Sequence, residues 1–344
     1  MKSARFLSGI LFLVCIIVVL SIPSIGAEAG NNPPIRLYVR EASLKILGKE
    51  VKVMEIAQES GVQGFDPQTS QGFDVEVVNQ LKEPTSIHWH GILLPASMDG
   101  VPYVNQEPIP PNGTMTYKFP LKQSGTYWMH SHFGLQEQTL NSAPLILQSE
   151  EQKAKADEQY VVLLSDFSFE PPGQILKELK GGMKKMKSTS AMNQMPNKEK
   201  LIAQKWDDGA QRFVPATVEG ELPDTDFKYD ALIANRRTLE DPEVFRVKSG
   251  HTVLLRIIAG SSATNFFVNT GALTAELTAV DGKDVLPLSG NYFQLGIAQR
   301  IDLLVKIPDE GGVFPLLAQG EGTRRIRCIC MDTTSRWSKS TVRS

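Results

Sequence analysis

The sequence predicts an all-β protein made of two Greek-key β-sandwich domains in series. The first observation behind this prediction is a series of short β-branched and aromatic runs, separated by turn residues and without long helical periodicity. The second is that this pattern stops at a charged stretch, 150–159, and then starts again. The third is size, because 344 residues with 41% hydrophobic residues suffice for two ordinary domains.

The first domain is expected at 30–149, and the charged stretch 150–159 is expected to be a linker. The expected strands of the first domain are 35–42, 51–58, 73–81, 114–121, 126–132 and 143–148. The second domain is expected at 160–322, with a polar, partly helical insertion at about 171–226. Its expected strands are 160–167, 229–234, 252–259, 265–271, 273–280 and 300–307.

The N-terminus has the three parts of a secretory signal. Lys2 and Arg5 precede an apolar run at 6–22, and small residues follow up to Ala29. We therefore expect residues 1–29 to be a signal peptide and the mature protein to be periplasmic or secreted, with no stable membrane span. A retained membrane anchor is the alternative, because the apolar run approaches the length of a span.

The C-terminal residues 323–344 have an unusual composition, with six Lys or Arg, one acidic residue and almost no alternation of apolar and polar positions. They are expected to be an atypical basic tail: a disordered end, the product of a reading-frame change, or an arm for an anionic surface. Over the whole chain the net charge is −2, so no basic excess supports a nucleic-acid partner.

Histidine is the residue that points to chemistry, because four of the five histidines lie between positions 88 and 132. They form two H-x-H pairs, His88 with His90 and His130 with His132. Residues two apart on a strand share a face, so each pair can direct two imidazoles into one cavity. Four imidazoles suit copper, zinc, iron or nickel, and the affinity order among divalent ions favours copper. His251 has no patterned partner and is expected to be an ordinary surface or capping residue.

These motifs resemble those of multicopper oxidases of the bacterial copper-resistance type. HWHG at 88–91, MDGVP at 98–102, IPP at 109–111 and SGTYWMHSH at 124–132 stand in the order and spacing of that family's first domain. The segment from 249 to 268 resembles its second domain. The resemblance implies cupredoxin-like domains, bound copper, and oxidation of Cu(I) or a phenol-like substrate coupled to reduction of dioxygen to water.

The resemblance also implies a role for each motif residue. His88 is similar to the first-domain ligand of the type 2 copper, and the other three histidines, His90, His130 and His132, to ligands of the paired type 3 coppers. Asp99 falls where the family keeps an acidic residue that relays protons; it is also suited to a simple turn before Gly100. Trp89 and Trp128 are interpreted as packing residues.

The family's third-domain motifs, H-x-x-H-x-H and H-C-H, are not found in the sequence. No histidine follows His251, and Cys328 and Cys330 have no flanking histidines. We therefore expect a multicopper oxidase shortened at its C-terminus and inactive alone, with copper ligands from the first domain only and dioxygen as a partner only in a completed site. Two alternatives are an exported protein that sequesters or delivers copper, and one part of a split oxidase completed by a separately encoded third domain.

Four methionines of the insertion offer thioether sulfurs, which select Cu(I). They are Met183, Met186, Met192 and Met195. The alternative is an amphipathic segment in which methionine fills gaps, and the sequence leaves this choice open.

Overall fold

The structure, a computed structural model, describes residues 33–186, 199–207, 209, 212–220, 227–321 and 326–333. The expected signal segment, Met192, Met195 and the tail beyond residue 333 lie outside the described residues, as do the side chains of Met183 and Met186. Within the described part of the chain, no helix is both long enough and apolar enough to cross a membrane.

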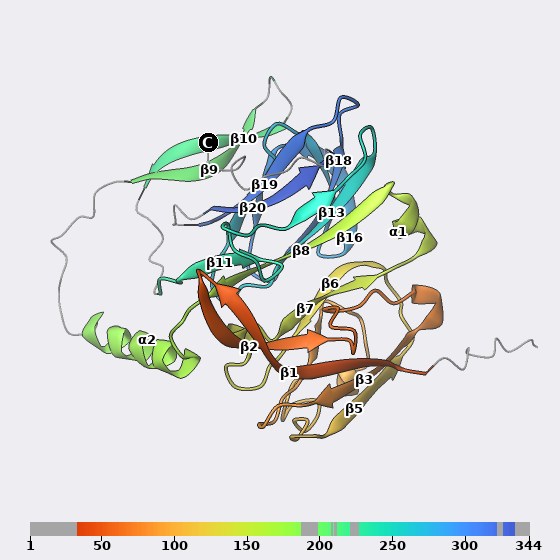
Figure 1. The fold of residues 1–344 in the computed structure, drawn as a ribbon, viewed down its shortest axis with the longest axis vertical. Coiled ribbons are helices and arrows are strands. Elements are labelled where there is room, and N and C mark those ends of the chain that lie inside the picture. The colour runs from red at the N-terminus through yellow and green to blue at the C-terminus, as the bar shows by residue number, and fades with distance from the viewer. Residues whose placement is uncertain are drawn as a thin grey trace, which may run out of the picture. The chain divides into compact units, whose positions relative to one another are not determined.

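The first domain is a sandwich of two β-sheets (Figure 1). One sheet has the strand order β2-β1-β3-β5, and the other has the order β4-β6-β7. Their bounds are β1 (Ile35–Ile46), β2 (Lys49–Ala57), β3 (Phe73–Asn79), β4 (His88–His90), β5 (Thr114–Phe119), β6 (Gly125–His130) and β7 (Ser142–Leu147). Three short 3-10 helices lie in the connections: η1 (Thr69–Gln71), η2 (Ala96–Met98) and η3 (Glu137–Thr139). Every second residue of β3 is buried, as expected for a strand with one face on the core.

Strand β6 differs from its neighbours because all six of its residues are buried. Tyr127 and Met129 pack into the core of the first domain. On the opposite face, Trp128 packs against Leu163 and Ile258 of the second domain. A strand covered on both faces loses the alternation of apolar and polar residues, which explains the continuous run of bulky residues before His130.

The second domain is also a sandwich, with an eight-stranded sheet and a five-stranded sheet. The larger has the order β11-β8-β13-β18-β15-β16-β10-β9, and the smaller has the order β12-β20-β19-β14-β17. The bounds in chain order are β8 (Glu158–Phe167), β9 (Glu199–Asp207), β10 (Arg212–Gly220), β11 (Ala231–Ala234), β12 (Val244–Arg246), β13 (Thr252–Ala259), β14 (Phe266–Asn269), β15 (Ala275–Val280), β16 (Lys283–Gly290), β17 (Tyr292–Leu295), β18 (Arg300–Lys306), β19 (Val313–Gly320) and β20 (Ile326–Asp332). The predicted all-β fold of two β-sandwich domains in series is confirmed.

The expected linker, insertion and tail all contribute helices or strands to this fold. The expected linker forms α1 (Glu150–Ala154), whose first turn is capped by the Ser149 hydroxyl, and then the start of β8. The expected insertion holds α2 (Pro172–Met186) and the β9-β10 hairpin. Residues 326–332 of the expected tail form β20, which pairs with β19 and β12. The second domain therefore extends beyond the expected boundary at 322, because Ile329 and Met331 complete its apolar core.

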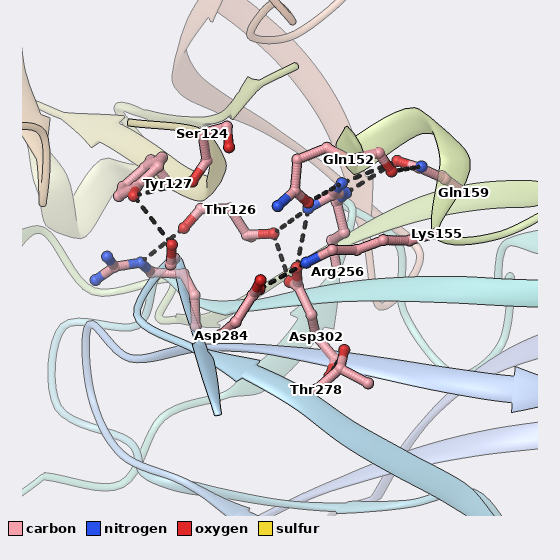
Figure 2. Close-up of polar contacts among 12 residues, drawn as sticks. Ser124, Thr126, Tyr127, Gln152, Lys155, Gln159, Arg256, Thr278, Asp284 and Asp302 are labelled. Carbon is pink, nitrogen blue, oxygen red and sulfur yellow. Dashed lines mark hydrogen bonds and ion pairs between the residues drawn. The ribbon is translucent and has the colours of Figure 1, made fainter. Parts of the chain in front are cut away.

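A buried polar network joins the two domains beside β6 (Figure 2). Its centre is Arg256 on β13, which is fully buried and forms an ion pair of 2.9 Å with Asp302 on β18. Thr126 on β6 donates its hydroxyl to Asp302 and accepts from Arg256 at 2.9 Å. The side-chain oxygens of Gln152 and Gln159 accept hydrogen bonds from the remaining N–H groups of the Arg256 guanidinium at 3.0 to 3.1 Å. Every N–H group of the arginine side chain is directed at an acceptor.

Candidate metal centre

Strands β4 and β6 bring the two H-x-H pairs together. They are antiparallel neighbours in which His88 lies opposite His130 and His90 lies opposite Trp128. Trp89, between the first two histidines, is fully buried in the domain core against Phe73. Alternation along the strand therefore turns the side chains of His88 and His90 away from that core.

Four imidazoles converge there, and we call them the histidine cluster: His88, His90, His130 and His132. The ring of His88 has its centroid 4.8 to 5.6 Å from those of the other three. The centroid of His130 lies 5.5 Å from that of His90 and 4.8 Å from that of His132. One ring nitrogen from each of His88, His90 and His130 falls in a group whose atoms lie within 4.8 Å of one another. The spacing of these nitrogens suits metal ions held by imidazoles.

The turn after η2 fixes the orientation of His88. Its Nδ1 lies 2.7 Å from the main-chain oxygen of Asp99 and 3.3 Å from the Asp99 carboxylate. A carbonyl oxygen only accepts, so Nδ1 carries the proton and Nε2 keeps its lone pair for a metal. Gly100 lets the turn approach this closely: its φ is +81°, and a Cβ there would lie 1.8 Å from the oxygen of Ile87.

Burial favours the neutral form of three of the four imidazoles, those of His88, His90 and His132. It is the main cause that lowers the pKa of His90 to about 3, and the charges of His130 and Arg300 lower it further. Burial also lowers the pKa of His88 and of His132. A neutral imidazole has the free lone pair that a metal ion requires, so these three side chains can bind a cation at neutral pH.

Trp128 closes one side of the cluster. Its ring is stacked on that of His130, with centroids 4.2 Å apart and an angle of 13° between the planes, and its centroid lies 5.0 Å from that of His90. Because Leu163 and Ile258 of the second domain cover this indole, water is excluded from that side. This is the packing role that the sequence predicted for Trp128.

Three features near the cluster were not predicted from the sequence. Glu137 on η3 has Oε2 3.2 Å from His130 Nδ1. Gln136, just before it, is buried, and its side chain makes five hydrogen bonds. Arg300 of the second domain donates to the carbonyl oxygen of Thr126 and lies over the Tyr127 ring. The sequence signal for the first two is only their closeness to the HSH motif, and for Arg300 there is none.

His251 lies outside the cluster. Its Nδ1 is 2.8 Å from the Glu158 carboxylate at the edge of the second domain. This contact resembles an ordinary surface ion pair, in line with the sequence interpretation.

Two family models match the chain, and both are described as multicopper oxidase: one covers residues 39–152 and the other covers residues 158–333. The chain belongs to the multicopper oxidase family. The resemblance inferred from the sequence motifs is thereby confirmed. Family membership implies copper, and the imidazole nitrogens of the histidine cluster fit that metal.

Two relatives of this chain are copper resistance proteins. Copper resistance protein A of Escherichia coli is 32% identical over 317 residues, which is 87% of this chain and 50% of that protein. The copper resistance protein A homolog of Pseudomonas syringae pv. tomato is 31% identical over 310 residues, 87% of this chain and 51% of that protein. The chain thus spans about half the length of the curated relatives it matches.

Among solved structures, the multicopper oxidase Fet3p, which functions in iron import, superposes with a TM-score of 0.66 and 19% identity. The match covers 88% of this chain and 53% of Fet3p. Because the two sequences are only 19% identical, this match supports the cupredoxin-like fold alone.

Proposed function

We propose that the histidine cluster binds copper and forms part of the copper site of an oxidase that couples oxidation of Cu(I) or a phenol-like substrate to reduction of dioxygen to water. The single observation that carries the proposal is the convergence of four imidazoles beside β4 and β6. The copper resistance proteins among the relatives support copper as the metal.

Bound copper would supply one-electron steps and a place for dioxygen. In our assignment His88 serves the type 2 copper, and His90, His130 and His132 serve the paired type 3 coppers. Asp99 is half-buried beside His88, where its carboxylate can hold a proton and pass it toward the cluster. Trp128 keeps the other side dry. We propose that the protein acts outside the cytoplasm, as its N-terminal segment suggests.

Copper titration of the full-length chain tests the metal assignment. We expect tight copper binding that is lost when all four histidines of the cluster are replaced by alanine. His251→Ala is the matched control, because it removes the remaining histidine and should leave binding intact. Equal copper affinity in the four-histidine variant and the wild type would refute the assignment.

An oxidase assay on the copper-loaded chain then tests the reaction. Oxygen consumption with Cu(I) or a phenol, abolished in the four-histidine variant, would support the oxidase function. Tight copper binding without oxygen consumption would refute oxidase activity of the chain alone; it is the result expected both of a protein that sequesters or delivers copper and of an oxidase part that is inactive alone.

A further inference from the structure

A carboxylate lies behind the histidine cluster. Glu137 Oε2 is 3.2 Å from His130 Nδ1. His130 Nε2, on the other side of the ring, lies 3.3 Å from His90 Nδ1 inside the cluster. The carboxylate and Nδ1 are close but not aligned as a hydrogen bond, so Nδ1 is a buried polar atom without a hydrogen-bond partner. A small rotation of the Glu137 side chain would supply one.

The position of Glu137 is fixed by the residue before it. The Gln136 side-chain oxygen accepts from Ser131, between the two histidines of the HSH motif, at 2.8 Å and from Thr85 at 2.7 Å. Its amide nitrogen donates to Glu83 at 2.8 Å. This buried network ties the start of η3 to the loop that carries the ligands, and so it holds Glu137 beside His130.

The ring of His130 is equally constrained. Only 6% of His130 is exposed, and its ring is stacked on Trp128. Nδ1 therefore faces Glu137 while Nε2 faces the cluster. His88 has the same arrangement, with Nδ1 bound to the Asp99 oxygen. Ligating histidines usually donate their second ring N–H to such an acceptor.

We propose that Glu137 is the positioning residue for His130: its carboxylate accepts the Nδ1–H and thereby presents the Nε2 lone pair to copper. The inference rests on the proposed copper-binding function and adds a specific residue to it. In this proposal Glu137 acts through His130 and is not itself a metal ligand.

The test compares Glu137→Gln and Glu137→Ala in the full-length chain. We expect copper affinity to fall about 10- to 100-fold in Glu137→Ala, and less in Glu137→Gln because the amide oxygen still accepts a hydrogen bond. The control is Glu76→Ala, which removes a carboxylate paired with Arg36 on the other sheet of the domain, and it should bind copper like the wild type. The urea midpoint of the metal-free protein should be unchanged in Glu137→Gln.

A spectroscopic readout separates positioning from a structural effect. With ¹⁵N-labelled histidine and Cu(I) as a diamagnetic probe, the wild type should show His130 with its proton on Nδ1. That signal should shift or broaden in the Glu137 variants, while the signal of His88 stays in place.

The outcomes distinguish the two proposals. If the wild type binds copper and both Glu137 variants match it in affinity and in the His130 signal, the positioning role is overturned and the copper site stands. If the wild type does not bind copper, the proposed function falls, and the positioning role falls with it.

Discussion

The histidine cluster and the Arg256 network each include a side chain of β6, His130 in the cluster and Thr126 in the network. Only in the network is every hydrogen-bonding group of the central side chain paired. In the network, each donor of Arg256 meets an acceptor on Asp302, Thr126 or a glutamine. In the cluster, nitrogens face one another, and the Nδ1 of His130 has no hydrogen-bond partner. A satisfied network stabilises the fold by itself, whereas imidazoles with free lone pairs gain a partner only from a ligand. The following predictions test this contrast, from the largest expected effect to the smallest.

Arg256→Ala should destabilise the protein most, by about 3 to 5 kcal/mol, because it leaves the Asp302 charge buried without its partner. Urea unfolding measures the change. The control is Arg237→Ala, which removes an exposed pair with Asp241 and should cost at most about 1 kcal/mol. A loss below about 1 kcal/mol in Arg256→Ala would show that the network is not a structural element.

Added copper should stabilise the wild type by about 2.7 kcal/mol when free copper is about 100 times its Kd. The four-histidine variant should lose this increment, and Arg256→Ala should retain it despite its lower starting stability. Urea unfolding with and without copper measures both. Loss of the increment in Arg256→Ala would mean that the network and the cluster are not separable.

Gly100→Ala should destabilise the protein by about 1 to 3 kcal/mol more than Gly48→Ala. Both glycines have φ near +80°, but a Cβ meets the oxygen of Ile87 at Gly100 and meets nothing within 4 Å at Gly48. Copper affinity should fall only in Gly100→Ala, because the turn also holds His88. Equal effects of the two substitutions would show that the close approach is unimportant.

The smallest effect is a pH dependence at Glu158, away from both regions. Burial raises the pKa of Glu158, but hydrogen bonds from the Lys248 amide, Tyr160 and His251 outweigh it, and the net pKa is lowered. A lowered pKa in the folded state stabilises the protein above the ordinary value of 4.5, and this contribution is lost as the pH falls through the folded pKa. The stability difference between wild type and Glu158→Gln should therefore shrink as the pH falls below about 4.5. A difference that does not change with pH would contradict this.

Much of the fold could be predicted from local patterns. The strands of the first domain alternate between buried and exposed positions or carry β-branched runs, and their expected positions match β1, β2, β3, β5, β6 and β7 closely. The strands that were missed, such as β4, β12 and β20, are short or atypical in composition. The pairings of β4 with β6 and of β12 with β20 join segments that are distant in sequence, and such pairing has no local signal.

The sequence by itself determined the two β-sandwich domains, the family and the four histidines, because strand periodicity places residues two apart on one face. Only the tertiary structure decided that Glu137 lies against His130, that Trp128 is covered by the second domain, and that Arg256 joins β6 to β13 and β18. These contacts connect residues from separate strands and loops. These contacts depend on side-chain packing and burial between segments that are far apart in the chain.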